Sequence, residues 1–269
     1  MEHNFKVNLP LAILITLIAV IYQRSTGPTY PKKFNLNGNK IKLLRSHGGT
    51  TDAPIELPKI TSDSSAKLIY KRFPTNDEWT TIEFKDHGSF LTAHLPNQPP
   101  AGKIQYYIEL LSNQNLESLG SKDSPIIIRF KGHVPSLILA PHIFFMFFSM
   151  LLAILAALEA FNKKDSFYSL TKATCFCLIT GGMILGPLVQ KYAFGVYWAG
   201  FPFDWDLTDN KLLIAVIAWT IALILNLKKR NRFVTIIAAI VLIGVYSIPH
   251  SMQGSQYNYD EGKVETDLD

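Results

Sequence analysis

Long apolar runs constrain this chain more than any other feature of its sequence. One run covers residues 9–22, and four more follow one another between residues 134 and 249. A helix needs about 20 mostly apolar residues to cross the ~30 Å hydrocarbon core of a bilayer. The runs therefore predict an integral membrane protein with about five transmembrane helices. We expect these helices at about 8–23, 135–161, 168–190, 211–227 and 233–249.

The segment 1–26 is predicted to be an uncleaved signal anchor. Its apolar run has about the length of a signal-peptide core, but no small-x-small cleavage motif follows it. The run instead meets the polar sequence Gln23-Arg24-Ser25-Thr26. The first helix should therefore remain in the protein, with the amino terminus inside the cell.

Basic residues after two of the apolar runs predict the orientation of the chain. They form one cluster after the second run and one after the fourth: Lys163 and Lys164, then Lys228, Lys229, Arg230 and Arg232. Basic loops stay in the cytoplasm under the positive-inside rule. The segment 27–133, the loop 192–210 and the acidic tail 251–269 are then extracytoplasmic. No N-x-[ST] motif occurs, which fits a multi-pass protein of a bacterial cytoplasmic membrane.

The polar segment 27–133 has the pattern of a β domain. Short strands are expected at 40–44, 67–72, 79–84, 89–95, 103–110 and 125–130. In the fifth of these, Ile104, Tyr106 and Ile108 alternate with polar residues, so one face is apolar. Turns rich in glycine and proline separate the strands. This number and spacing of strands predicts a mixed α and β membrane protein, with an extracytoplasmic β-sandwich inserted between the first and second helices.

One stretch of this segment resembles a known group of folds. The sequence from Phe90 through Leu95 and Pro96 to Tyr106 is similar to the E–F corner of fibronectin type III and Ig-like domains. In those domains a Leu closes one strand and a Tyr opens the next. The resemblance implies an Ig-like sandwich, an architecture that is more typical of adhesion and interaction modules than of enzymes.

Two histidines flank an unusual aromatic loop. His142 lies in the outer third of the second predicted helix, and His250 follows the fifth. The loop between helices three and four carries five aromatic residues and three aspartates: Tyr197, Trp198, Phe201, Phe203 and Trp205, with Asp204, Asp206 and Asp209. An aromatic belt at the lipid headgroups explains one or two such rings. A flat aromatic platform beside two imidazoles would also suit a large planar ligand whose metal is bound axially.

The loop is similar to the tryptophan-rich WWD signature of the heme-handling proteins of cytochrome c assembly. The matching residues are Phe194-Gly195-x-Tyr197-Trp198, then Trp205-Asp206, then Lys211. In that family two outer histidines flank the loop, one before it and one after it. The resemblance implies heme as the cofactor, with His142 and His250 as ligands of the iron. The cofactor-binding set would then also contain Tyr197, Trp198, Trp205 and Asp206.

The aspartates of the loop allow a second interpretation. Asp204, Asp206 and Asp209 offer carboxylate oxygens, which are the ligands that Ca²⁺ prefers, although their spacing is not that of an EF-hand. Asp209 could equally cap the fourth helix, which is expected to begin near Lys211.

Other residues inside the apolar runs have structural interpretations. Gly182 and Gly186 form a small-x-x-x-small pair that lets a second helix approach closely, and Pro187 should kink the same helix. Glu159 lies near enough to the inner interface to snorkel. Cys175 and Cys177 point to nearly opposite sides of a helix and are expected to be apolar fillers.

Two functions remain open from the sequence. The chain has no nucleophile elbow, P-loop, G-x-G-x-x-G, H-E-x-x-H or C-x-x-C-H motif, and its net charge of +5 is not gathered on one nucleic-acid-binding helix. The first function is to bind or present heme at the outer face, in cytochrome assembly or electron transfer. The alternative is a non-catalytic membrane anchor or complex subunit whose sandwich docks an extracytoplasmic protein partner, to which the acidic tail could contribute.

Overall fold

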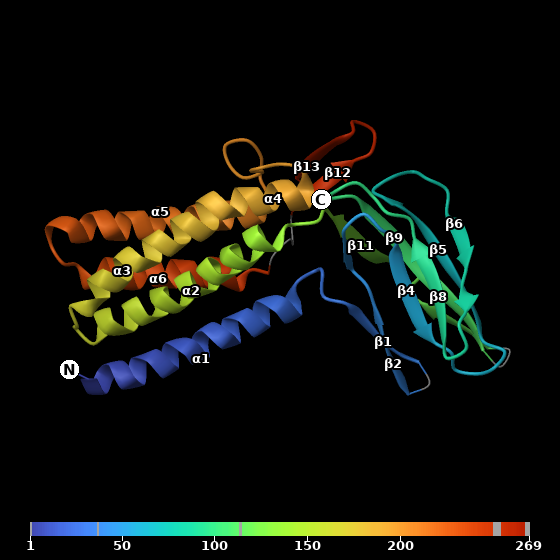
Figure 1. Cartoon of the computed structure of the whole chain (residues 1–269), viewed down its shortest axis with the longest axis horizontal. Coiled ribbons are helices and arrows are strands. Elements are labelled where there is room, and N and C mark those ends of the chain that lie inside the picture. The colour runs from blue at the N-terminus through green and yellow to red at the C-terminus, as the bar shows by residue number, and fades with distance from the viewer. Residues whose placement is uncertain (1, 37, 113–114, 250–253, 267–269) are drawn as a thin grey trace.

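Helices and strands separate into two parts in the computed structural model, which describes residues 2–36, 38–112, 115–249 and 254–266. A helical bundle forms one end of the molecule, and a β domain stands at the other end (Figure 1). The chain enters the β domain from the first helix and returns to the bundle just before the second. The mixed helix and strand composition predicted from the sequence is confirmed.

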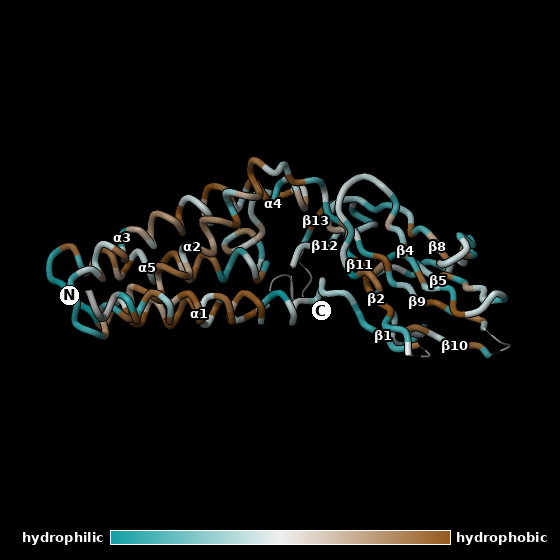
Figure 2. Tube along the Cα trace, turned by 60° about the horizontal axis from the view of Figure 1, so that its bottom comes forward, coloured by the Kyte–Doolittle hydropathy of each residue, from teal (hydrophilic) through white to brown (hydrophobic). Residues whose placement is uncertain are grey.

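The bundle consists of apolar helices that run along its length (Figure 2). Their bounds are α1 Glu2–Thr26, α2 Ser136–Phe161, α3 Ser166–Cys177, η1 Leu178–Leu185, α4 Gly186–Phe194, α5 Leu207–Lys228 and α6 Arg232–Ser247. Within the described residues, four stretches are long and apolar enough to cross a membrane: Lys6–Thr26, Ser136–Phe161, Ser166–Phe194 and Leu207–Lys228. The fifth predicted span corresponds to α6, which is apolar but has only 16 residues.

The third long stretch is continuous but changes its winding in the middle. α3 passes into the π-helix η1 and then into α4, whose first turn contains Pro187. A proline has no amide hydrogen and clashes with the carbonyl four residues earlier in an α-helix. The π-helix ends two residues before Pro187, whose missing amide falls in the first turn of α4. The kink expected at Pro187 stays a prediction.

Two glycines of η1 allow neighbouring helices to approach closely. A Cβ atom on Gly181 would lie 2.6 Å from Cβ of Phe145 in α2, and one on Gly182 would overlap with Cδ1 of Leu212 in α5. Gly186 has only ordinary contacts, at 3.8 Å or more. The packing role predicted for this pair is therefore confirmed at Gly182, and Gly181 supplies a second close approach.

Glu159 is buried at the end of the bundle that lies away from the β domain. Its carboxylate accepts a hydrogen bond from Asn8 Nδ2 at 2.7 Å and another from the Ser166 hydroxyl. Asn162 donates in turn to Asn8 Oδ1 at 3.1 Å. The expectation that Glu159 snorkels to water is wrong, since its side chain is satisfied inside the bundle, where it ties α1 to α2 and α3.

The β domain consists of two sheets that share one core with the hairpin β1–β2. The larger sheet has the order β3-β11-β9-β5-β6, with β10 paired to β9, and the smaller has the order β4-β8-β7. The bounds are β1 Lys32–Leu36, β2 Asn39–Leu43, β3 Ser46–Gly48, β4 Ala53–Pro58, β5 Ser65–Phe73, β6 Thr80–Glu83, β7 Lys85–Asp86, β8 Phe90–Leu95, β9 Lys103–Ser112, β10 Asn115–Leu119 and β11 Ile126–Lys131. All six predicted strands are present, each within two residues of its predicted bounds.

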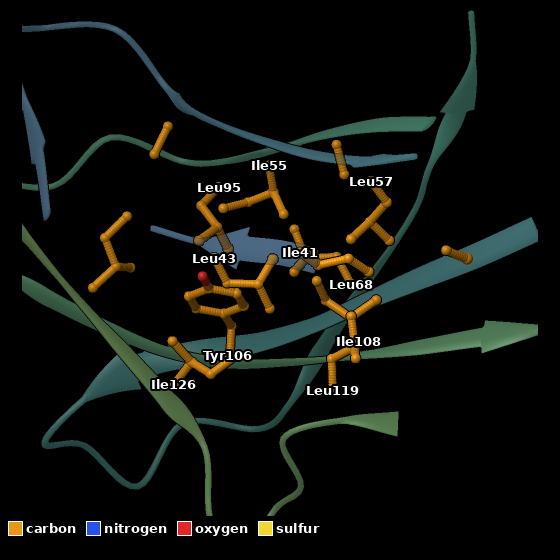
Figure 3. Close-up of a cluster of buried hydrophobic side chains, with 14 of the residues drawn as sticks. Ile41, Leu43, Ile55, Leu57, Leu68, Leu95, Tyr106, Ile108, Leu119 and Ile126 are labelled. Carbon is orange, nitrogen blue, oxygen red and sulfur yellow. The ribbon is translucent and has the colours of Figure 1, made fainter. Parts of the chain in front are cut away.

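Tyr106 lies in the centre of this core, where Figure 3 shows its ring near Leu43 and Ile126. The predicted inward face of β9 is confirmed, because Ile104, Tyr106 and Ile108 are fully buried. The Tyr106 hydroxyl donates a hydrogen bond to the Leu44 carbonyl at 2.8 Å. Burial raises the pKa of Tyr106 far above its ordinary value, so the group stays a neutral donor.

The close approach at Gly181 predicts a specific steric cost. Gly181→Ala should destabilise the protein by about 1–3 kcal/mol, because the new methyl group meets Phe145 at its Cβ atom, which cannot move without the backbone of α2. Gly244→Ala is the matched control, since a Cβ atom on Gly244 in α6 meets nothing within 4 Å. The thermal unfolding midpoint of both variants in mild detergent tests this, and equal midpoints would contradict the packing described for η1.

Candidate functional site

A cavity of about 470 Å³ lies where the helical bundle meets the β domain. One wall is a stripe of α2 residues at positions i, i+3, i+4, i+7, i+8 and i+11 of the helix: Leu139, His142, Ile143, Met146, Phe147 and Met150. The facing wall comes from α4 and α5, and Arg129 and Lys131 of β11 line the end near the β domain. The cavity is therefore mostly apolar along α2, with the basic groups of β11 at one end and with Asp206, Asp209 and Lys211 lining it at the start of α5.

His142 is the titratable group on the apolar wall of this cavity. Its Nδ1 lies 2.8 Å from the carbonyl oxygen of Gly181 in η1. A carbonyl oxygen only accepts hydrogen bonds, so Nδ1 carries the hydrogen, and in a neutral ring Nε2 holds the lone pair. Gly181 thus sets both the orientation and the tautomer of the imidazole, and Nε2 is the nitrogen left for a ligand.

The basic end of the cavity is formed by β11. The Arg129 guanidinium stacks 4.3 Å from the centre of the Phe194 ring and donates to the Ser255 carbonyl. Lys131 is half-buried and has no acidic ion-pair partner among the described residues. Burial and the nearby Arg129 charge lower the pKa of Lys131 from its ordinary value. An anionic group in the cavity would offset that cost.

Asp206 caps α5 and also lines the cavity. Its Oδ1 accepts hydrogen bonds from the amides of Thr208 at 2.8 Å and Asp209 at 3.3 Å. Its Oδ2 accepts from the amide of Ser255 at 2.9 Å and from the Ser255 hydroxyl at 3.2 Å. The prediction that Asp209 caps this helix is wrong, because α5 begins at Leu207, four residues earlier than expected, and Asp206 stands at the cap.

The other two loop aspartates bind separate backbone amides. Asp204 Oδ2 accepts from the amide of Thr266 at 2.9 Å, while Asp209 Oδ2 accepts from the amide of Ala199 at 2.7 Å. Across the described part of the chain, no group of three or more His, Cys, Asp or Glu residues is placed to hold a metal ion. The structure therefore gives no support to Asp204, Asp206 and Asp209 as a shared cation site.

The aromatic loop lies outside the cavity for most of its length. Tyr197, Phe203 and Trp205 are each more than half exposed, at 57%, 81% and 62%. Phe194 and Asp206 reach the cavity wall, whereas Tyr197, Trp198 and Trp205 do not. The structure thus brings together His142 and Asp206 of the predicted set and leaves the three aromatic residues apart from them. His250 lies outside the described residues.

The tail contains a β-hairpin that joins the two halves of the molecule. It consists of β12 Ser255–Asn258 and β13 Lys263–Thr266. On the bundle side, Ser255 and Thr266 donate to the loop aspartates described above. On the β-domain side, the Tyr257 amide donates to the Ala101 carbonyl at 3.1 Å. Residues 254–266 of the acidic tail, which the sequence suggested as a partner-binding segment, therefore form a structural clamp between the aromatic loop and the β domain.

Tyr259 fixes the tip of this hairpin to the β domain. Its hydroxyl lies 2.9 Å from Gln98 Oε1 and 3.1 Å from the Lys103 carbonyl oxygen. Burial raises the pKa of Tyr259 to about 12. Sequence reasoning missed this hairpin, although Asn258 and Gly262 bracket a turn between two short segments that carry Tyr257 and Val264.

Comparison with known proteins adds no assignment. The chain matches no protein-family model, no curated protein and no solved structure.

The role of Asp206 predicts a large effect of a small change. Asp206→Ala should cost about 2–4 kcal/mol, because it removes a helix cap and leaves the buried Ser255 amide without its acceptor. Asp165→Ala is the control, since Asp165 precedes α3 without a capping bond and its Arg232 contact is exposed. Thermal unfolding and protease cleavage within 254–266 measure the difference. A loss no larger than that of the control would disprove the clamp.

Proposed function

We propose that the protein binds heme in the cavity beside His142, at the outer face of the membrane that its helices cross. The observation that carries the proposal is the hydrogen bond between His142 Nδ1 and the Gly181 carbonyl. Histidines that ligate metals commonly donate their second ring N–H to such a group, which orients the ring and raises its basicity. His142 would then bind the iron through Nε2.

The remaining walls of the cavity suit the rest of this ligand. Lys131 and Arg129 lie at the end near the β domain, where they would pair with the propionate carboxylates. The α2 stripe and Leu212 would cover the apolar ring and exclude water. Heme held there would supply one-electron redox chemistry, or would serve as cargo for an assembly partner.

The aromatic loop takes a different role in this proposal from the one its resemblance implies. We assign the exposed rings of Tyr197, Phe203 and Trp205 to the lipid headgroup region, as an aromatic belt beside the cavity. Asp206 caps the first turn of α5 and thereby fixes the position of the cavity wall that this helix forms. His250 stays a proposed second ligand of the iron.

The arrangement of the ends supports five spans with the β domain outside the cytoplasm. The two basic loops meet at the end of the bundle opposite the β domain, where Arg232 donates to the Lys163 carbonyl at 3.2 Å (Figure 1). Asn8 of α1 lies at the same end, bonded to Asn162. We therefore place this end in the cytoplasm of a bacterial cell, with α6 as a short fifth span.

A second candidate is a complex subunit whose β domain docks an extracytoplasmic protein. The observation that favours it is the strand order, in which β4 pairs with β8 while β5, β9 and β11 form the facing sheet with β3 parallel to β11. That order supports the Ig-like resemblance.

Cysteine cross-linking tests whether a partner docks on the β domain, since both native cysteines are buried and leave an introduced cysteine as the reactive one. A discrete adduct from Thr81→Cys on edge strand β6, lacking from Asn115→Cys on β10, is expected if a partner docks at that edge.

Heme binding predicts a spectroscopic signature that depends on one residue. Protein purified in mild detergent from heme-replete cells should show a Soret band, and its visible bands should sharpen on reduction with dithionite. His142→Ala should lose most of the bound heme, because it removes the proposed ligand of the iron. Lys131→Gln should weaken heme retention about tenfold, because it removes the proposed ion pair with a propionate.

His94→Ala serves as the matched control, because His94 is an exposed histidine on β8 that does not line the cavity. A featureless spectrum at good protein yield would reject the proposal. Equal heme content in the wild type, His142→Ala and His94→Ala would show that any bound heme lies elsewhere.

A further inference from the structure

A second basic region of the chain has no role in the heme site. Residues 3–51 contain no Asp or Glu. Six basic residues follow the apolar part of α1 within this stretch: Arg24, Lys32, Lys33, Lys40, Lys42 and Arg45. Their positive charge is therefore not balanced by acidic neighbours in the sequence.

The fold gathers three of these residues around one pocket. The pocket has a volume of about 400 Å³ and lies between the end of α1 and the hairpin β1–β2. Arg24 reaches it from α1, while Lys33 and Lys42 reach it from β1 and β2. Thr29, Tyr30 and Pro31 complete the wall. None of the described acidic side chains lines this pocket.

The two lysines face each other across the hairpin. Lys33 and Lys42 are directly paired in the β1–β2 register. Like charges at such a position destabilise a strand pair. On the larger sheet, Lys67 instead faces Glu83, with Nζ 3.4 Å from Oε1. Within the described residues neither Lys33 nor Lys42 has an acidic partner, so an anion between them would relieve the repulsion.

The positive charges of these lysines act on the hydroxyl group of Tyr30. A hydrogen bond from Lys33, together with the charges of Lys33 and Lys42, lowers the pKa of the Tyr30 hydroxyl. The Lys33 ammonium also lies 5.0 Å from the centre of the Tyr30 ring. The pocket thus offers two ammonium groups, one guanidinium and one phenol to an incoming anion.

An apolar surface adjoins this pocket. Leu17, Ile18 and Ile21 of α1 are each more than half exposed, and Ile21 precedes Arg24 by less than one turn. Because Lys6–Thr26 is a candidate membrane span, this surface faces acyl chains and the pocket lies at the depth of the headgroups. A ligand bound there meets positive charge at one end and hydrocarbon at the other.

We propose that Arg24, Lys33 and Lys42 bind the phosphate of an anionic phospholipid whose acyl chains lie along α1. The site is separate from the cavity beside His142, which no residue of this pocket lines. The lipid would fasten the hairpin β1–β2, and with it the β domain, to the membrane surface.

The test uses the full chain in an uncharged detergent, with thermal unfolding as the readout. A short-chain phosphatidylglycerol should raise the unfolding midpoint in a saturable manner, and phosphatidylcholine of the same chain length should not. In the double variant Lys33→Gln/Lys42→Gln the half-saturating phosphatidylglycerol concentration should rise about thirtyfold, as expected for the loss of two surface lysines. Without lipid the variant should be at least as stable as the wild type, since a repulsion is removed.

Lys67→Gln is the matched control, because it removes a cross-strand lysine that faces a glutamate, and its lipid response should equal that of the wild type. An unchanged response in the double variant would overturn the assignment of the site. An equal response to phosphatidylcholine would overturn the requirement for net negative charge. If inorganic phosphate alone reproduced the stabilisation, the site would be one for soluble phosphate and the lipid proposal would fail.

Discussion

The Asp206 carboxylate holds together three parts of the molecule that are distant in sequence. One oxygen closes the first turn of α5, and the other receives the amide and hydroxyl of Ser255 in β12. Because β12 also bonds to the β domain, the start of a membrane helix and the base of a sheet are joined through one buried side chain. A carboxylate can do this because each of its oxygens accepts more than one hydrogen bond. The walls of the cavity beside His142 depend on this junction.

The cavity also depends on how α2 is used. One stripe of this helix faces the cavity, while other residues pack against η1 so tightly that Gly181 has no room for a side chain. The same Gly181 carbonyl accepts the hydrogen of His142. The π-helical segment η1, which contains Gly181, therefore sets the position of His142, the imidazole that lines the cavity among the described residues. Packing and ligand geometry are determined by the same few residues.

Periodicity was sufficient to predict the helices and six of the eleven strands described in the β domain. The apolar runs located the helices, and alternation such as that of Ile104, Tyr106 and Ile108 located the strands. These patterns report burial within one element, and burial is what they predicted correctly. Short edge elements such as β3 and β7 were missed because two or three residues carry no period. The start of α5 was misplaced because Asp206 and Asp209 are both chemically able to cap the first turn of this helix.

The site was predicted less well, for a physical reason. His142 could be singled out because an imidazole in an apolar run is rare, but its partner is a backbone carbonyl, which every residue possesses. The aromatic loop drew attention by composition, yet exposure and not composition determines which rings reach a cavity. Lys33 and Lys42 are ordinary in sequence, and only the register of the hairpin makes them opposite neighbours.

The position of the hairpin β12–β13 has a consequence for biosynthesis. It follows α6 in the chain, so a ribosome completes it only after the helices α1 to α6 and the strands β1 to β11 have been made. Until then, the Asp206 carboxylate lacks the amide and the hydroxyl of Ser255 as hydrogen-bond donors. The link between the aromatic loop and the β domain is therefore the last of these contacts to form, and the two parts fold before it holds them in their final arrangement.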